Sequence, residues 1–394
     1  VQTCALPIFI IKKIWSDKQM AIQLFVPTFR IDECLAEIRE CLEKGWSGIG
    51  YKTIEFEEKW KEYTGLNNAH FLNSDTAALH LAIKVFKIQN KWNDGDEIIS
   101  TPITFVSSNH AIMYENLKVV FSDVDEYLCL NPKEVEKKIT DKTRAIMFVG
   151  LGGNVGRYKE IVNICKKYNL KLILDAAHMA GTRLNGEIVG KEADAVCYSF
   201  QAVKNLPTAD SGMICFKKNE DDQLVRKLSW MGIDKDTYAR DNGNYKWKYE
   251  VDYLGYKYNG NSIMAAIALV QLKYLDEDNN YRRQIAKWYD EYFDNSKKHI
   301  ERIPITKGCE CSRHLYIIAV DNRDKLITKL NENGIFPGVH YRDNTEYNVY
   351  NYKKGCCPYS KYMSERIISL PMHLRLTKRD IDYICNMIER YLGD

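Results

Sequence analysis

The sequence has little net charge and no long apolar run. Its 56 lysines and arginines against 53 aspartates and glutamates leave a formal charge of +3 at pH 7. This balance argues against a nucleic acid or a membrane as the main partner. The apolar stretch at residues 1–11 is too short to span a bilayer and lacks the basic start of a signal peptide. We expect residues 1–19 to be a tail outside the fold, with a strand following Met20.

The twelve cysteines do not have the spacing of a metal site, and the chain has no internal repeat. Most of the cysteines lie inside apolar runs, as reduced core residues of a cytosolic protein do. The two close pairs, Cys309 with Cys311 and Cys356 with Cys357, lack zinc-ribbon spacing. The sequence therefore predicts a cytoplasmic protein without a metal site.

Strand-like and helix-like patterns alternate along the chain. Short apolar runs at 97–100, 118–122 and 144–149 predict strands. Apolar residues at helical spacing predict helices at 33–44, 76–87, 159–168, 262–293, 323–333 and 378–391. This alternation favours an α/β fold with a mostly parallel sheet and helices on both faces. Because 394 residues exceed one ordinary core, we expect a large domain at 20–274 and a smaller C-terminal α/β domain at 275–394.

Three polar residues lie at the ends of two further strand-like runs or shortly after them. Asp175 comes directly after the run at 171–174, and Ser199 lies in the run at 195–200, five residues before Lys204. The carboxyl ends of strands in an open α/β sheet line the ligand crevice. An amine, a carboxylate and a hydroxyl that converge there suit pyridoxal phosphate, which needs a Schiff-base lysine, an acid at the pyridine nitrogen and a phosphate cup. Taken singly, each has a plainer interpretation, such as a solvated lysine or a helix-capping aspartate.

The segments around these residues resemble a known family. They read LDAAHMAG at 174–181, YSFQAVKN at 198–205 and PTADSG at 207–212. They are similar to the DegT/DnrJ/EryC1/StrS sugar aminotransferases, which belong to fold type I of the pyridoxal-phosphate enzymes. The resemblance extends from about Phe25 to Tyr391. It implies a large domain with a mostly parallel seven-stranded sheet flanked by helices, and a smaller C-terminal α/β domain.

The resemblance implies roles around the cofactor ring. Lys204 and Asp175 would be the catalytic residues: the lysine holds the cofactor and then moves a proton, and the aspartate meets the pyridine nitrogen. His178 would lie near the phenolic oxygen of the cofactor. Phe105 would lie flat on the pyridine ring. His340 would approach the sugar nucleotide.

The resemblance also implies a phosphate site, made by Ser199, by the helix start at Thr76 and, across a homodimer, by Asn259 of the other subunit. The family usually has a small residue where this chain has Asp75. The charge of Asp75 would repel a phosphate unless the side chain turns away, or the carboxylate could instead cap the helix. Both interpretations of Asp75 stay open. Ser211 is a second departure, because it replaces a usual glycine.

The implied function is a pyridoxal-phosphate-dependent aminotransferase that converts a nucleotide-linked keto-sugar to an amino-sugar. Glutamate or glutamine would be the amino donor, and the homodimer would share its active sites. Some family members carry histidine at the position of Lys204 and act as dehydratases, so the lysine favours transamination. Two alternatives stay open. One is another reaction of the same cofactor on a sugar or cyclitol, and the other is a catalytically weak, cofactor-binding regulatory relative.

Overall fold

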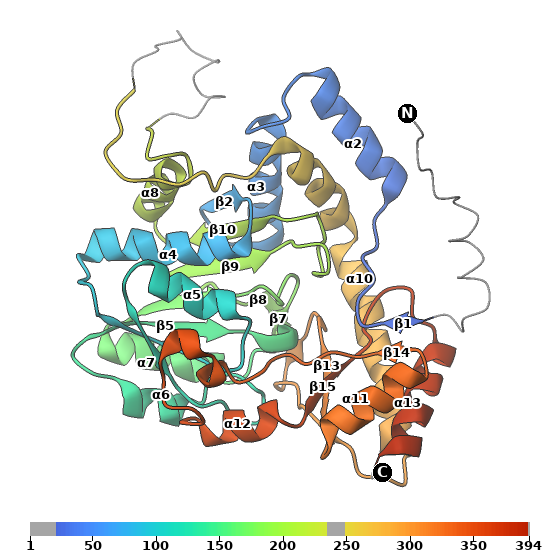
Figure 1. Ribbon diagram of the computed structural model, residues 1–394. Coiled ribbons are helices and arrows are strands. Elements are labelled where there is room, and N and C mark those ends of the chain that lie inside the picture. Colours follow the sequence, from blue (N-terminus) through green and yellow to red (C-terminus); the bar gives the residue numbers. More distant parts are fainter. Residues whose placement is uncertain (1–20, 235–248, 393–394) are drawn as a thin grey trace, which may run out of the picture.

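A seven-stranded sheet forms the centre of the protein (Figure 1). The computed structural model describes residues 21–234 and 249–392, so the expected tail at 1–19 lies outside the described residues. The strands are β2 (Ala69–Leu72), β3 (Glu97–Ser100), β4 (Lys118–Phe121), β5 (Thr143–Val149), β6 (Lys171–Asp175), β9 (Ala195–Ser199) and β10 (Gly212–Phe216). Their order is β2-β10-β9-β6-β5-β3-β4, and only β10 runs antiparallel to its neighbours. The predicted mostly parallel sheet is confirmed.

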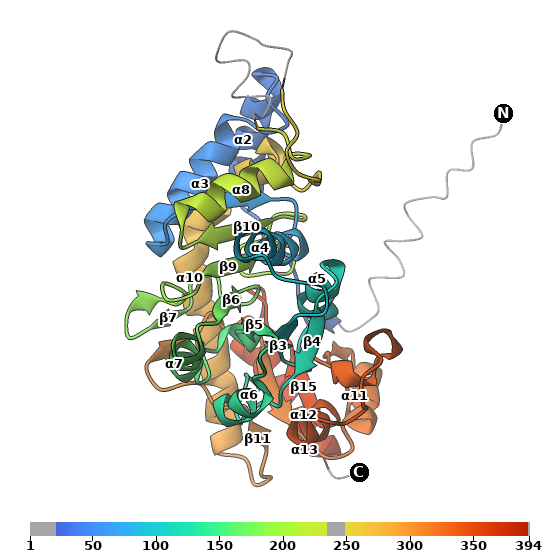
Figure 2. The ribbon, with the colours of Figure 1, turned by 90° about the vertical axis from the view of Figure 1, so that its left-hand side faces the viewer.

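Helices cover both faces of this sheet, which explains why its strands are apolar on both sides. One face packs against α4 (Asp75–Asn90), α5 (Val106–Tyr114) and α8 (Asn219–Ser229). The other face packs against α3 (Tyr51–Thr64), α6 (Pro132–Lys138), α7 (Tyr158–Tyr168) and the first half of α10 (Ser262–Asp294). Figure 2 shows α7 and α10 on one side of the sheet and α5 on the other. None of the described helices is long and apolar enough to cross a membrane.

A C-terminal lobe packs around the second half of α10. Its antiparallel sheet consists of β11 (Glu301–Arg302), β13 (Tyr316–Ala319) and β15 (Ile367–Leu370). The helices α11 (Arg323–Glu332) and α13 (Lys378–Tyr391) share an apolar core with this sheet and with α10. The expected domain boundary between 274 and 275 falls inside α10, which runs unbroken from the large domain into the lobe (Figure 1). The division into two domains at this boundary stays a prediction.

Smaller elements join the two parts of the chain. The strand expected after Met20 is only β1 (Ile22–Gln23), and it pairs with β14 (Ile335–Phe336) of the lobe. The hairpin β7 (Arg183–Leu184) and β8 (Glu187–Ile188) pairs with β12 (Cys309–Glu310). The remaining helices are α2 (Ile31–Glu43) and α12 (Pro358–Ser364), with the short 3₁₀ turns Leu151–Gly153, Asn344–Glu346 and Asn348–Tyr350. Strand β1 and the hairpin β7–β8 thus both pair with strands from the C-terminal part of the chain.

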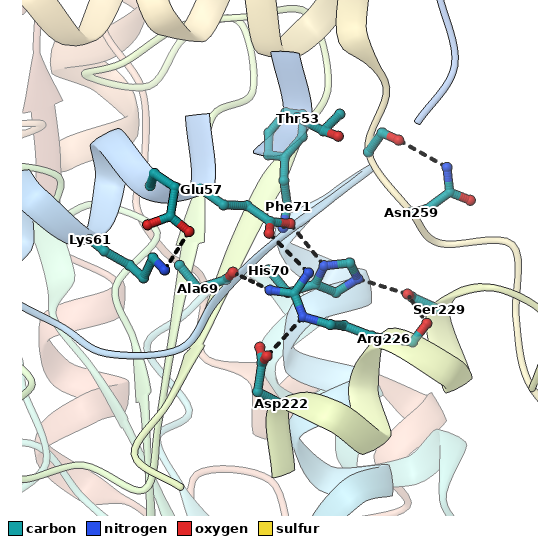
Figure 3. A network of polar contacts seen from close by, with 12 residues as sticks. Thr53, Glu57, Lys61, Ala69, His70, Phe71, Asp222, Arg226, Ser229 and Asn259 are labelled. Atoms are coloured by element: carbon teal, nitrogen blue, oxygen red, sulfur yellow. Dashed lines mark hydrogen bonds and ion pairs between the residues drawn. The ribbon is translucent and has the colours of Figure 1, made fainter. Parts of the chain in front are cut away.

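A buried polar network holds β2 between α3 and α8 (Figure 3). Glu57 of α3 accepts a hydrogen bond from the backbone N–H of Phe71 at 2.8 Å, and its Oε1 lies 3.0 Å from His70 Nδ1. Its second oxygen pairs with Arg226 of α8 at 2.9 Å. His70 Nε2 lies 2.8 Å from the hydroxyl of Ser229. Because β2 ends at residue 72 and α4 starts at residue 75, this network also positions the start of α4.

Glu57 remains ionised although it is buried. Removal from water opposes ionisation, but the charge of Arg226 and the hydrogen bonds from His70 and Phe71 outweigh it, so the pKa of Glu57 is lowered. A carboxyl whose pKa falls on folding stabilises the protein above its unfolded pKa of about 4.3. That contribution is lost as the pH drops through the lower, folded pKa.

We predict that Glu57→Gln lowers the free energy of unfolding by roughly 2 kcal/mol at pH 7, because it removes one of the two carboxylates that pair with Arg226 and weakens the charge-assisted hydrogen bonds to His70 and Phe71. The matched control is Glu58→Gln, which breaks the surface ion pair between Glu58 and Lys61 and should change stability by about 0.5 kcal/mol or less. Urea denaturation followed by circular dichroism measures both. The difference between wild type and Glu57→Gln should shrink below pH 4, and equal losses in the two variants would contradict the role of the network.

Candidate active site

A cavity of about 450 Å³ lies at the carboxyl ends of the parallel strands. Eight of the nine predicted site residues line it, and Asn259 does not. These eight are Asp75, Thr76, Phe105, Asp175, His178, Ser199, Lys204 and His340. They come from five segments of the sequence. The parallel strand order brings four of these segments to one edge of the sheet, and His340 meets them from the C-terminal lobe.

Lys204 lies in a tight turn that follows β9. Its N–H donates to the carbonyl of Gln201 at 2.8 Å, and the Gln201 side chain accepts from the N–H of Val203 at 3.0 Å. Farther along, the N–H and the hydroxyl of Thr208 both donate to the carbonyl of Phe200, at 2.8 and 2.7 Å. Removal from water lowers the pKa of Lys204 to about 8, while the nearby carboxylates act in the opposite direction. The amine is therefore available as a nucleophile and base close to neutral pH.

Asp175 is the last residue of β6, and two hydrogen bonds hold its carboxylate. The hydroxyl of Ser108, from α5, donates to Oδ2 at 2.7 Å, and the N–H of Ala177 donates to Oδ1 at 3.1 Å. Burial raises the pKa of Asp175, opposed by these hydrogen bonds and by the charge of Lys204. A buried carboxylate of this kind can keep a proton on a neighbouring ring nitrogen. Ser108 was not predicted from the sequence, because nothing in the local pattern of α5 marks one of its serines as a partner of β6.

His178 is neutral, and its ring orientation is set by the backbone. The N–H of Gly152 donates to His178 Nδ1 at 3.1 Å, so the ring proton resides on Nε2, which lies 3.4 Å from the hydroxyl of Tyr341. The ring also packs on His314, with 4.2 Å between the centroids. Burial and the charge of Lys204 hold the pKa of His178 well below its usual range. His178 can thus donate a hydrogen bond through Nε2, as the predicted place near a phenolic oxygen requires.

The C-terminal lobe supplies the opposite wall of the cavity. His340 Nδ1 lies 2.9 Å from the hydroxyl of Ser369 in β15, and burial lowers the pKa of His340 to about 4. Tyr341 follows it and faces Phe105 at 6.1 Å between ring centroids. The Phe105 side chain is 58% exposed, so it lies at the mouth of the cavity with a ring face available for stacking. The sequence analysis assigned no role to Tyr341.

The start of α4 presents free backbone N–H groups to the cavity. Ser74 is the N-cap residue, and its hydroxyl accepts from the N–H of Ala77 at 3.1 Å. The capping interpretation of Asp75 is therefore not what the structure shows, because Ser74 caps the helix and Asp75 is its first residue. The N–H groups of Asp75 and Thr76 have no partner within the helix, which makes this end an anion site.

Gly212 allows α4 to start this close to β10. A Cβ atom at Gly212 would lie 2.5 Å from the backbone nitrogen of Asp75, so no larger residue fits there without moving the turn. Its neighbour Ser211 lines the same cavity, and the hydroxyls of Ser211 and Thr208 lie 2.7 Å apart. Ser199 completes this corner of the cavity from the end of β9.

Asn259 lies next to the end of β2 and does not line the cavity. It bridges to Leu72 at the end of β2, and its Nδ2 donates to the carbonyl of Gly260 at 2.9 Å (Figure 3). Its Oδ1 is buried and has no hydrogen-bond partner among the described residues. The predicted contact of Asn259 with the phosphate of another subunit stays a prediction.

The donor set fits pyridoxal phosphate. Lys204 offers an amine of lowered pKa, Asp175 a buried carboxylate for the ring nitrogen, and His178 a neutral donor. The start of α4 offers free N–H groups for the phosphate. Asp75 is the one group in this set whose charge opposes the ligand.

Comparison with known proteins agrees with this arrangement. A sequence profile of the DegT/DnrJ/EryC1/StrS aminotransferase family matches residues 30–389. The spore coat polysaccharide biosynthesis protein SpsC of Bacillus subtilis is 32% identical over 90% of this chain and 93% of its own. Spr1654 from Streptococcus pneumoniae, assigned as a sugar aminotransferase and solved in its PLP-form, has 28% identity and a TM-score of 0.85 over 94% of this chain and 98% of its own.

A further solved structure with the same fold is PseC of Helicobacter pylori, an aminotransferase involved in the biosynthesis of pseudoaminic acid. It has 25% identity and a TM-score of 0.86 over 94% of this chain and 98% of its own. The predicted fold type is thus confirmed over nearly the whole chain.

We predict that Lys204 of the cofactor-free protein reacts with acetic anhydride half-maximally near pH 8, whereas exposed lysines follow an ordinary pKa of about 10.4. Asp175→Asn should move the midpoint for Lys204 lower still, because that carboxylate raises the pKa of the amine. Mass spectrometry of the Lys204 peptide after timed acetylation gives the rate at each pH. A midpoint near that of the exposed lysines would show that the amine is not desolvated.

Proposed function

The chain belongs to the DegT/DnrJ/EryC1/StrS aminotransferase family of pyridoxal-phosphate enzymes, and we propose that it converts a nucleotide-linked keto-sugar to an amino-sugar with glutamate or glutamine as amino donor. The observation that carries the proposal is the convergence of Lys204, Asp175 and His178 in one cavity. A lysine at this position favours amino transfer over the dehydration that the sequence analysis left open.

Each of these side chains has a distinct task in the proposed reaction. When bound, pyridoxal phosphate supplies an electron sink that makes the C–H bond beside the transferred nitrogen acidic. Lys204 Nζ would take that proton and return it to the carbon on the other side of the nitrogen, which its pKa of about 8 permits near neutral pH. Asp175 keeps a proton on the ring nitrogen, held in place by Ser108 and Ala177. His178 donates from Nε2 to the phenolic oxygen.

Three observations support a large, flat sugar-nucleotide substrate. The cavity reaches from the sheet to the C-terminal lobe, where His340 and Tyr341 line it. Phe105 offers an exposed aromatic face at its mouth, suited to stacking on a sugar or a base. SpsC is described as a spore coat polysaccharide biosynthesis protein, and PseC as an aminotransferase involved in the biosynthesis of pseudoaminic acid. All described cysteines are free, which supports a cytoplasmic location.

The test is product analysis with UDP-, GDP- and dTDP-linked 3- and 4-keto sugars, with ¹⁵N-labelled glutamate or glutamine as donor. We predict that one sugar gains the label and that Lys204→Ala lowers the rate at least ~10³-fold while folding normally. Borohydride reduction of the wild-type holoenzyme should attach the cofactor to the peptide that contains Lys204. A product that lacks the ¹⁵N label would favour a dehydratase, and no product from any sugar, with cofactor bound, would favour a regulatory protein.

We also propose that the enzyme is a homodimer in which Asn259 reaches the phosphate site of the other subunit. The resemblance of the segment around Asn259 to the family supports this, and the side-chain N–H group of Asn259, which here donates to the carbonyl of Gly260, would be the donor to the phosphate.

Mixing the Lys204→Ala and Asn259→Ala parents under subunit exchange should restore about a quarter of wild-type activity, since half of the dimers are mixed and each has one intact site. The matched control mixes Lys204→Ala with Asp175→Ala, which both lie in the same chain's cavity. Every site in that mixture lacks one of the two residues, so no activity should return. Equal outcomes in the two mixtures, with exchange verified by native mass spectrometry, would refute the shared site.

A further inference from the structure

Asp75 brings a carboxyl group into the part of the cavity where a phosphate is expected. It is the first residue of α4, its side chain is only 8% exposed, and it lines the cavity beside Ser74 and Thr76. The side chain therefore does not turn away from the anion site. Because Ser74 already caps the helix, Asp75 is not needed for that task.

No group of the described chain compensates Asp75 directly. Its Oδ1 is buried and has no hydrogen-bond partner within residues 21–234 and 249–392. The titratable groups around it are Lys204, Asp175 at the end of β6, Cys197 of β9, and Asp210 at the rim of the cavity. Two of these four are carboxylates. Burial and the charge of Asp175 raise the pKa of Asp75 well above its usual range, and only Lys204 acts in the opposite direction.

A phosphate at this end of α4 would meet a carboxylate in a site with little water. Two anions repel each other far more strongly there than in bulk solvent. The helix dipole offsets only about half of a unit charge, which is less than the phosphate itself carries. A proton between the two groups removes the repulsion and replaces it with a charge-assisted hydrogen bond.

We propose that Asp75 and the phosphate ester of the cofactor share one proton, taken from solvent on binding, so that Asp75 is a hydrogen-bonding partner of the phosphate instead of a repelling charge. The O–H bond of the shared proton forms while the buffer acid or hydronium ion that supplies the proton loses it, and no other bond changes. The inference rests on the proposed assignment of this cavity to the cofactor. At pH values where Asp75 and the free phosphate are both ionised before binding, the affinity for the phosphorylated cofactor therefore falls tenfold for each unit by which the pH rises.

Pyridoxamine 5′-phosphate is the suitable probe, because it has no aldehyde to react with Lys204. Calorimetric titrations from pH 6.5 to 9, in two buffers of different ionisation enthalpy, give both the affinity and the number of protons taken up. Asp75→Asn is the matched variant, since the amide has the same shape and can donate a hydrogen bond without titrating. Asp210→Asn is the control, because it removes an exposed carboxylate from the rim of the same cavity.

We predict that wild type and Asp210→Asn take up about one proton more per site than Asp75→Asn above pH 7.5. Over the same range the affinity of wild type relative to Asp75→Asn should fall about tenfold per pH unit. The difference in proton uptake should persist when both proteins also carry Lys204→Ala, because the amine then no longer titrates. It should vanish for pyridoxamine, which lacks the phosphate.

Equal proton uptake by wild type and Asp75→Asn would overturn the proposal. An undiminished difference in proton uptake between the two proteins when pyridoxamine is the ligand would overturn it as well. If neither protein binds pyridoxamine 5′-phosphate, the assignment of the cavity to the cofactor fails, and with it the proposed function. Should thermal melting show that Asp75→Asn is unfolded, Asp75→Gly takes its place, because it also lacks the titrating group and removes side-chain bulk without adding any. The same difference in proton uptake is expected from it.

Discussion

Removal from water of one amine and two carboxyl groups in a single cavity is the constraint that shapes this site. Burial favours the neutral form of each group, so it lowers the pKa of Lys204 and raises the pKa of Asp175 and of Asp75. The opposite charges act against these shifts, because each stabilises the charged form of the other. The balance leaves Lys204 with a pKa of about 8, where an amine can exchange protons under ordinary conditions.

This balance requires the groups to be held rigidly, and the neighbouring elements do so. Ser108 and Ala177 orient the carboxylate of Asp175, and the N–H of Gly152 sets the ring of His178. Farther away, the ion pair of Glu57 with Arg226 fixes β2, whose end leads into α4 (Figure 3). The charged network at the edge strand β2 and the charged cavity at the carboxyl ends of the strands are thus linked through a few residues of backbone.

The site also depends on contacts between parts of the chain that are distant in sequence. His340 and Tyr341 reach the cavity from the C-terminal lobe, and α10 connects that lobe to the sheet without a break. Together with the large domain, they enclose a space that neither part could enclose alone. This division suits an enzyme that must hold a cofactor firmly on the sheet and accept a variable sugar against the lobe.

The sequence by itself determined the α/β class, the long helices and the residues that meet in the cavity. Periodicity revealed α10 and α13, and the family resemblance of the segments around Asp75, Phe105, Asp175, Lys204 and His340 named eight residues that line one space. These features are local in the chain, so local patterns report them. The roles of Ser108 and Tyr341 and the antiparallel direction of β10 were decided only by the tertiary structure. The physical reason is that a hydrogen bond or an ion pair across the fold depends on which segments pack together, and no single stretch of sequence contains that information.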